Sequence, residues 1–254
     1  MAFGCEHMIS IDELKKIKEI RKTNLYYAEK EYLQYIFLNS ISKYAEDFVF
    51  KGGTCLRIVY EFERASEDLD FNTNLTINKI KKIVKNSLKH FELLNIDYEI
   101  YSEKEFEGNY RVEIRFKGLL FTGHKRTTNT IKIDFSKRKT FTKEAQIVKK
   151  LFSDVPPFTI ITMGKEELLA EKFRALCMRK QARDLYDVWM LIKMKIPINK
   201  KILNKKLKED NILKFKLNLP QKKEYQNDLK LLVNNIPKYE QVTKDIKDFI
   251  NNIF

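Results

Sequence analysis

The chain has 254 residues, 43% of them apolar and 12% aromatic, which is enough for a buried core in one large domain or two modest ones. No apolar run approaches the roughly 20 residues of a membrane-spanning helix, and none follows the N-terminus as in a signal peptide, so we expect a cytoplasmic protein without membrane contact. Lysine and arginine outnumber the acids by 49 to 35, and a net charge of +14 favours a polyanionic partner, although a bias of the whole proteome would give the same excess.

The predicted elements follow one another from helices to a mixed core and back to helices. Residues 1–8 read as an expression leader, because a natural start follows at Met8. Helical spacing and period-two alternation predict helices at 10–22, 27–45, 54–60, 77–91, 164–180, 183–195, 199–209 and two more from about 221, with strands at 48–50, 68–72, 97–101, 110–116, 130–136 and 159–163. This order predicts an α+β fold with a mixed sheet, divided into an N-terminal helical extension (1–45), a core (46–163) and a C-terminal helical domain (164–254).

A glycine turn, Lys51-Gly52-Gly53-Thr54, joins the first predicted strand to a helix. Glycines let backbone amides approach a ligand closely, and the start of a helix favours negative charge. The turn is therefore a candidate phosphate-binding site for a triphosphate. A simple strand-to-helix turn would have the same sequence.

Two aspartates, Asp68 and Asp70, lie two residues apart in the next predicted strand, so both point to one face. Their like charges call for a cation, and carboxylates with phosphate oxygens are the ligands that Mg²⁺ prefers. Asp134, which is also opposite an apolar strand face, is the candidate third ligand. Three acids beside a triphosphate site suggest chemistry with two metal ions, while solvated strand-edge acids are the alternative.

Lys172 lies within the apolar arc of the helix predicted at 164–180, so we expect it to face inward, either toward the acids or snorkelling to solvent. Arg174 falls on the opposite arc with Glu167 and Glu171, which predicts a surface position. In the next helix Asp184 and Asp187 share a face with the apolar stripe, where they either need a partner or complement the helix dipole.

These motifs together resemble the AbiEii/AbiGii nucleotidyltransferase toxins of type IV toxin–antitoxin and abortive-infection systems, to which the MenT proteins are related. The resemblance covers most of the chain. It rests on NLYYAEK at 24–30, FKGGT at 50–54 with Leu56 and Arg57, SEDLDF at 66–71, AEKFRAL at 170–176 and RDLYD at 183–187.

The resemblance implies a minimal nucleotidyltransferase fold like that of DNA polymerase beta, with an NTP as substrate and Mg²⁺ as cofactor. It implies nucleotide binding by the turn and by Arg57, metal binding by Asp68 and Asp70, and activity that depends on Asp70, Lys172 and Asp184. Arg183 and Asp187 are weaker candidates from the same motif. The implied partners are a tRNA 3′ end, or another RNA, as acceptor and a cognate antitoxin.

Two alternatives stay open at the level of the sequence. One is a non-catalytic module that binds NTP or nucleic acid, and the other is an enzyme that transfers a nucleotidyl group to a protein or a small molecule. No residue pattern identifies an acceptor pocket, so an assay with labelled NTPs has to separate them.

Overall fold

The computed structural model describes residues 8–252, so the suggested leader lies outside them except for Met8. The chain divides into two compact units, of which the first ends at Thr162 and the second begins at Met163. Within the described residues, no helix combines the length and the apolar character needed to cross a membrane.

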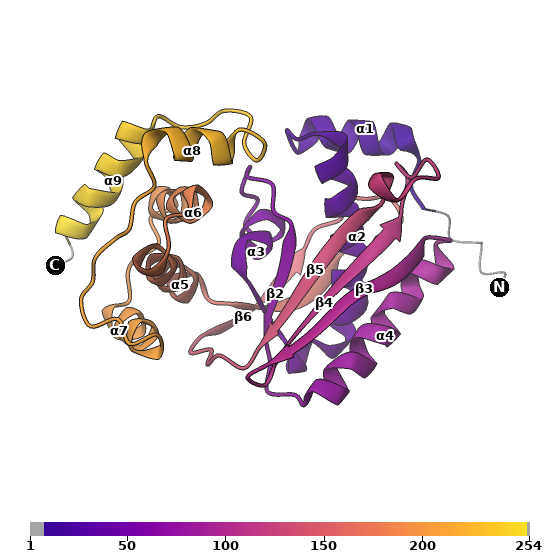
Figure 1. Ribbon diagram of the computed structural model, residues 1–254, viewed down its shortest axis with the longest axis horizontal. Coiled ribbons are helices and arrows are strands. Elements are labelled where there is room, and N and C mark those ends of the chain that lie inside the picture. Colours follow the sequence, from indigo (N-terminus) through magenta and orange to yellow (C-terminus); the bar gives the residue numbers. More distant parts are fainter. Residues whose placement is uncertain (1–7, 253–254) are drawn as a thin grey trace. The chain divides into compact units, whose positions relative to one another are not determined.

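The first unit contains the sheet and the helices that pack on it (Figure 1). In chain order its elements are α1 (Ile11–Ile20), α2 (Leu25–Ile41), η1 (Ser42–Asp47), β1 (Val49–Lys51), α3 (Gly52–Ile58), β2 (Asp68–Asn72), α4 (Ile77–Leu93), β3 (Asp97–Phe106), β4 (Asn109–Lys117), η2 (Lys125–Thr127), β5 (Asn129–Ser136), β6 (Lys143–Val148) and β7 (Phe158–Met163).

The strands form a seven-stranded mixed sheet in the order β3-β4-β5-β2-β1-β7-β6, and Figure 1 shows β2, β5, β4 and β3 side by side. β2 runs parallel to β5 and antiparallel to β1. One face of the sheet is apolar, and Phe71 stacks on Phe135 there at 5.4 Å between ring centroids. From α4, Phe91 packs against Phe116 of β4 at 4.6 Å. Because this face is buried, the alternating polar residues of the same strands lie on the other face.

The mixed α+β architecture agrees with the expectation. One strand, β3, is longer than predicted, and another, β6, is not predicted at all. β3 continues to Phe106, five residues beyond its predicted end, because its last residues are charged and exposed at the edge of the sheet and carry no apolar alternation. β6 was missed because only Val148 of its six residues is buried. Both are edge strands, whose pairing depends on a neighbour and not on a buried face.

The second unit is helical, with α5 (Lys165–Met178), α6 (Ala182–Lys193), α7 (Lys200–Glu209), α8 (Lys222–Leu229) and α9 (Tyr239–Asn251). Phe173 of α5 stacks on Phe249 of α9 at 6.2 Å. The Trp189 indole of α6 donates to the Asp245 carboxylate of α9 at 2.8 Å. These contacts hold α9 against α5 and α6.

Arg174 is not on the surface, which corrects the expectation from the helical wheel. It is 9% exposed and forms ion pairs with Asp210 and with Glu171. Glu167 is fully buried and forms an ion pair with Lys206 of α7 at 2.8 Å. The wheel identified a polar face correctly, but α7 covers that face and turns it into a buried charge network.

Candidate active site

The two acids of the predicted metal pair lie on one face of β2. They are partly exposed, whereas the apolar residues between and after them are fully buried, because successive side chains of a strand point to opposite faces. In the parallel pairing with β5, Asp70 lies opposite Asp134 and Asp68 lies opposite Lys132. The three aspartates predicted as metal ligands therefore share one face of the sheet.

The glycine turn brings its backbone against Asp70. Lys51, the last residue of β1, is the antiparallel partner of Asp70. Gly52 has a φ of +78°, and a Cβ atom there would overlap with the Asp70 carboxylate. A Cβ atom at Gly53 would overlap with the Arg64 guanidinium. Glycine at both positions therefore lets the Asp70 carboxylate and the Arg64 guanidinium approach the backbone of the turn closely.

Two residues expected to contact the nucleotide have buried side chains. The Thr54 hydroxyl is hydrogen-bonded to the Ser66 hydroxyl at 2.9 Å and to the backbone carbonyl of Asp68. Arg57 is 2% exposed and pairs with Glu31 at 3.0 Å. Since residues three apart share a helix face, both side chains of α3 turn inward. In this structure the two side chains bind neighbouring parts of the first unit.

Two basic residues that sequence reasoning did not select pair with the acids. Lys132 Nζ lies 2.8 Å from the Asp68 carboxylate, and Arg111 Nε lies 2.6 Å from the Asp134 carboxylate. All four side chains are partly exposed. Lys132 lies two residues before Asp134 in β5, so the same alternation places both side chains on the polar face. The sequence pattern therefore could have identified Lys132 as a neighbour of the acids.

The acid pair suits a divalent cation. Carboxylate oxygens are hard donors, and glycine at position 52 lets the turn approach the Asp70 carboxylate closely. Within residues 8–252, no group of three His, Cys, Asp or Glu side chains is placed to hold a metal ion together. Asp134 is engaged by Arg111 and Asp68 by Lys132, so a cation at Asp68 and Asp70 has to displace Lys132, with its other ligands coming from the substrate. Asp134 can join only after leaving Arg111.

Helix α2, which carries the first motif of the resemblance, makes hydrogen bonds to the residues that precede β2 and to β5. Gln34 is fully buried, and its side-chain amide donates to the carbonyls of Ser66 at 3.2 Å and Glu67 at 3.0 Å. Lys30, 4% exposed, donates to the carbonyl of Thr130, and its burial lowers its pKa. In α2, Gln34 therefore fixes the lead-in to Asp68, and Lys30 of the motif fixes the neighbouring end of β5.

In the second unit, Lys172 faces inward and meets the two acids of α6. Its Nζ lies 3.2 Å from the Asp184 carboxylate and 2.8 Å from the Asp187 carboxylate. Both acids are fully buried, and Arg179 also pairs with Asp184 at 2.8 Å. Arg183, a weaker candidate, is partly exposed and donates to the side chain of Gln181 at 2.8 Å. The partner expected for the α6 acids is thus Lys172.

This cluster should make stability depend on acidity. Burial alone would raise the pKa of Asp184, but Lys172 and Arg179 lower the pKa to about 2 from its usual value of 3.8. A carboxyl whose pKa is lower in the folded state stabilises the fold above its unfolded pKa, and this contribution is lost as the pH falls through about 2. We expect the wild type to lose about 2 kcal/mol more than Asp184→Asn in free energy of unfolding between pH 5 and pH 2. Urea denaturation measures this difference, and equal losses in both proteins would contradict the assignment.

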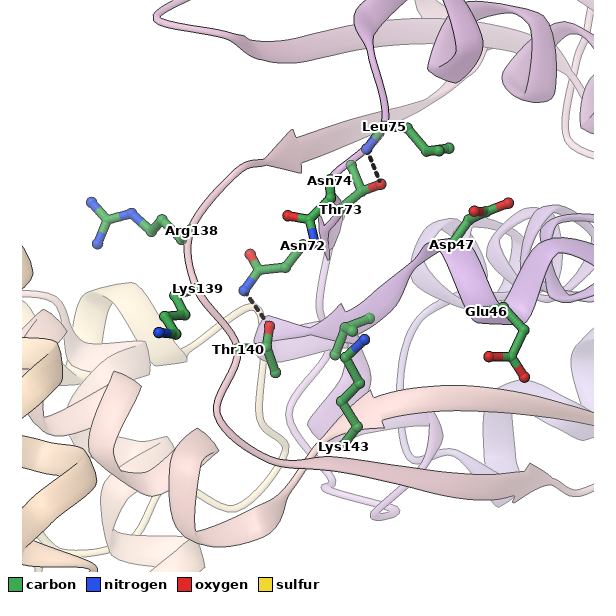
Figure 2. A pocket seen from close by; sticks show the side chains of 11 residues that line it. Glu46, Asp47, Asn72, Thr73, Asn74, Leu75, Arg138, Lys139, Thr140 and Lys143 are labelled. Atoms are coloured by element: carbon green, nitrogen blue, oxygen red, sulfur yellow. Dashed lines mark hydrogen bonds between the residues drawn. The ribbon is translucent and has the colours of Figure 1, made fainter.

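A cavity of about 360 Å³ lies in the first unit, at the opposite end of β2 from Asp68 (Figure 2). Asn72, the last residue of β2, donates there to the Thr140 hydroxyl at 2.9 Å. No residue predicted for the site lines this cavity, which is formed by residues 46, 47, 49, 72–75, 138–140 and 143. It is therefore separate from the acid pair and the glycine turn.

Comparisons with known proteins point to one family. Residues 36–254 match the family model described as "Nucleotidyl transferase AbiEii toxin, Type IV TA system". Among solved structures, the nucleotidyltransferase toxin MenT4 of Mycobacterium tuberculosis is similar with a TM-score of 0.66 and 16% identity, over 93% of this chain and 88% of that one. The protein JHP933 of Helicobacter pylori has a TM-score of 0.58 and 22% identity, over 91% and 93%. No curated protein sequence matches the chain.

Proposed function

Because the chain belongs to the AbiEii family of nucleotidyl transferase toxins, we propose that it transfers a nucleotidyl group from an NTP to the 3′ end of a tRNA, with Mg²⁺ at the acid pair. The family establishes a nucleotidyltransferase of a toxin–antitoxin system. The metal, the acceptor and the residue roles are our proposal. The observation that carries it is the placement of Asp68 and Asp70 on one face of β2, with the glycine turn directly against Asp70.

Each part of the first unit has a distinct role in this reaction. Asp68 and Asp70 hold the cation, and the amides of Gly52 and Gly53 bind phosphate oxygens, with Lys51 adding positive charge at the end of β1. When bound, Mg²⁺ supplies the charge that activates the acceptor hydroxyl and stabilises the leaving pyrophosphate. The buried contacts of Thr54 and Gln34 keep the turn and the acid strand in register.

In the second unit, we assign Lys172 and Asp184 to the activity on the basis of the family resemblance. Lys172 is the cation of this assignment, and Asp184 orients its ammonium through their ion pair within the second unit. Asp187 contributes a second carboxylate to the same ammonium at 2.8 Å.

An RNA acceptor is supported by the net charge of +14, since a basic protein gains binding free energy by releasing the counterions of a polyanion. NTPs and tRNA occur together in the cytoplasm, which is where we place the protein. The toxin family also supports a cognate antitoxin as a further partner.

Labelling tests the proposal directly. The protein is incubated with Mg²⁺ and each of the four NTPs carrying an α-phosphate label, in the presence of total RNA, total protein or a small-molecule extract. We expect the label on RNA of tRNA size with one or two of the NTPs. Label found only on protein or small molecules would overturn the RNA acceptor. NTP binding in calorimetry without transfer to any acceptor would favour a non-catalytic binder.

A further inference from the structure

Lys132 pairs with the Asp68 carboxylate, which is also the proposed metal ligand, so the lysine and a metal ion would compete for it. It lies directly opposite Asp68 in the pairing of β2 with β5, and its Nζ is 2.8 Å from the carboxylate. The side chains of Lys132 and Asp68 are 31% and 27% exposed, so the pair is less screened than one on an open surface. One strand pair further out, Arg111 engages Asp134 at 2.6 Å in the same way.

A divalent cation that binds Asp68 has to take the carboxylate from this ammonium. The divalent ion then lies close to the Lys132 ammonium, and the two cations repel each other unless a ligand with negative charge binds beside them. A triphosphate supplies that charge, since its oxygens can accept hydrogen bonds from the displaced ammonium. Metal and nucleotide then each favour the binding of the other, as linked ligands must.

We infer that Lys132 competes with the metal ion for Asp68 and passes to the substrate phosphates when the metal binds, so that the cation binds weakly until the nucleotide is present. This inference rests on the proposed function, because it takes the acid pair as the metal site. It adds a positioning residue that neither the family resemblance nor the sequence patterns assigned.

Titration of the full chain with Mn²⁺ alone, followed by electron paramagnetic resonance of the free ion, tests the competition without any turnover. Lys132→Met is expected to bind Mn²⁺ about fivefold more tightly than the wild type, as expected for the loss of an ion pair of about 1 kcal/mol. Lys132→Arg retains the charge and the ion pair, so its affinity is expected to stay near the wild-type value. Lys132→Gln gives a second uncharged variant if the methionine impairs folding.

Lys117→Met is the matched control. Lys117 of β4 pairs across strands with Asp97 of β3 at 3.1 Å, so this variant loses the same charge and a more exposed cross-strand ion pair away from the acid pair. Its affinity for Mn²⁺ is expected to equal that of the wild type. A gain of equal size in Lys117→Met and Lys132→Met, or no gain in either, would overturn the inference.

The double variant Lys132→Met with Asp70→Asn separates this inference from the proposed function. If the acid pair holds the metal, the double variant loses the tight binding of Lys132→Met. Tight binding that persists would place the cation elsewhere, and the metal assignment would fail together with the inference. Equal Mn²⁺ affinity in the wild type and Lys132→Met, with loss in Asp70→Asn, would reject only the inference.

Discussion

Asp70→Asn is expected to lower the rate of nucleotidyl transfer by at least about 100-fold while the protein stays folded. The amide keeps the shape of the side chain, which packs closely against Gly52, but removes the charge that binds the cation. Because Asp70 is partly exposed, the loss of its charge should change the free energy of unfolding little. Transfer of label to RNA measures the first effect, and urea denaturation measures the second.

Glu113→Gln is the matched control for this variant. Glu113 is a partly exposed acid of β4 that lies opposite Lys132 on the same polar face, but it is not among the predicted metal ligands. Its variant is expected to keep transfer within a few-fold of the wild type. Full activity in Asp70→Asn would reject the metal assignment, and an equal loss in Glu113→Gln would show that any acid of this face has the same effect.

The sequence predicts the central part of the fold well because its strands bury one face. In β2, β4 and β5 the apolar residues alternate without interruption, and this period is a direct consequence of packing against helices. The edge strands β3 and β6 have no such face, so their extent depends on pairing that the sequence does not display. The sequence also predicts the helices of the second unit. However, α7 packs on the face of α5 that carries Arg174, and a helical wheel of α5 alone cannot predict this tertiary contact.

The same distinction applies to the site. The face shared by Asp68, Asp70 and Asp134 follows from strand periodicity, and the close approach of the turn to Asp70 follows from a residue without a side chain at position 52. Burial of Arg57 could not be derived in that way, because its partner Glu31 lies in a helix 26 residues earlier. Local patterns therefore identified which residues share a face, whereas long-range ion pairs such as Arg57 with Glu31 could not be derived from them.

The ion pairs of Lys172 lead to the second large expected effect. Lys172→Ala should abolish transfer and also lower the free energy of unfolding by about 3–5 kcal/mol, because two fully buried carboxylates lose the ammonium at 2.8 and 3.2 Å. Loss of activity alone would therefore not distinguish a catalytic lysine from a structural one. The transfer rate has to be expressed per folded molecule, at a temperature and urea concentration where the variant is native by circular dichroism.

Lys206→Ala provides the comparison that separates the two roles. Lys206 is fully buried in the same unit and pairs with Glu167 and Glu171, both at 2.8 Å, so its removal should destabilise the fold to a similar extent. Its transfer rate per folded molecule is expected to stay within a few-fold of the wild type, whereas that of Lys172→Ala should be lost. Equal rates per folded molecule in the two variants would remove Lys172 from the reaction and leave it, with Asp184 and Asp187, as a purely structural cluster of the second unit.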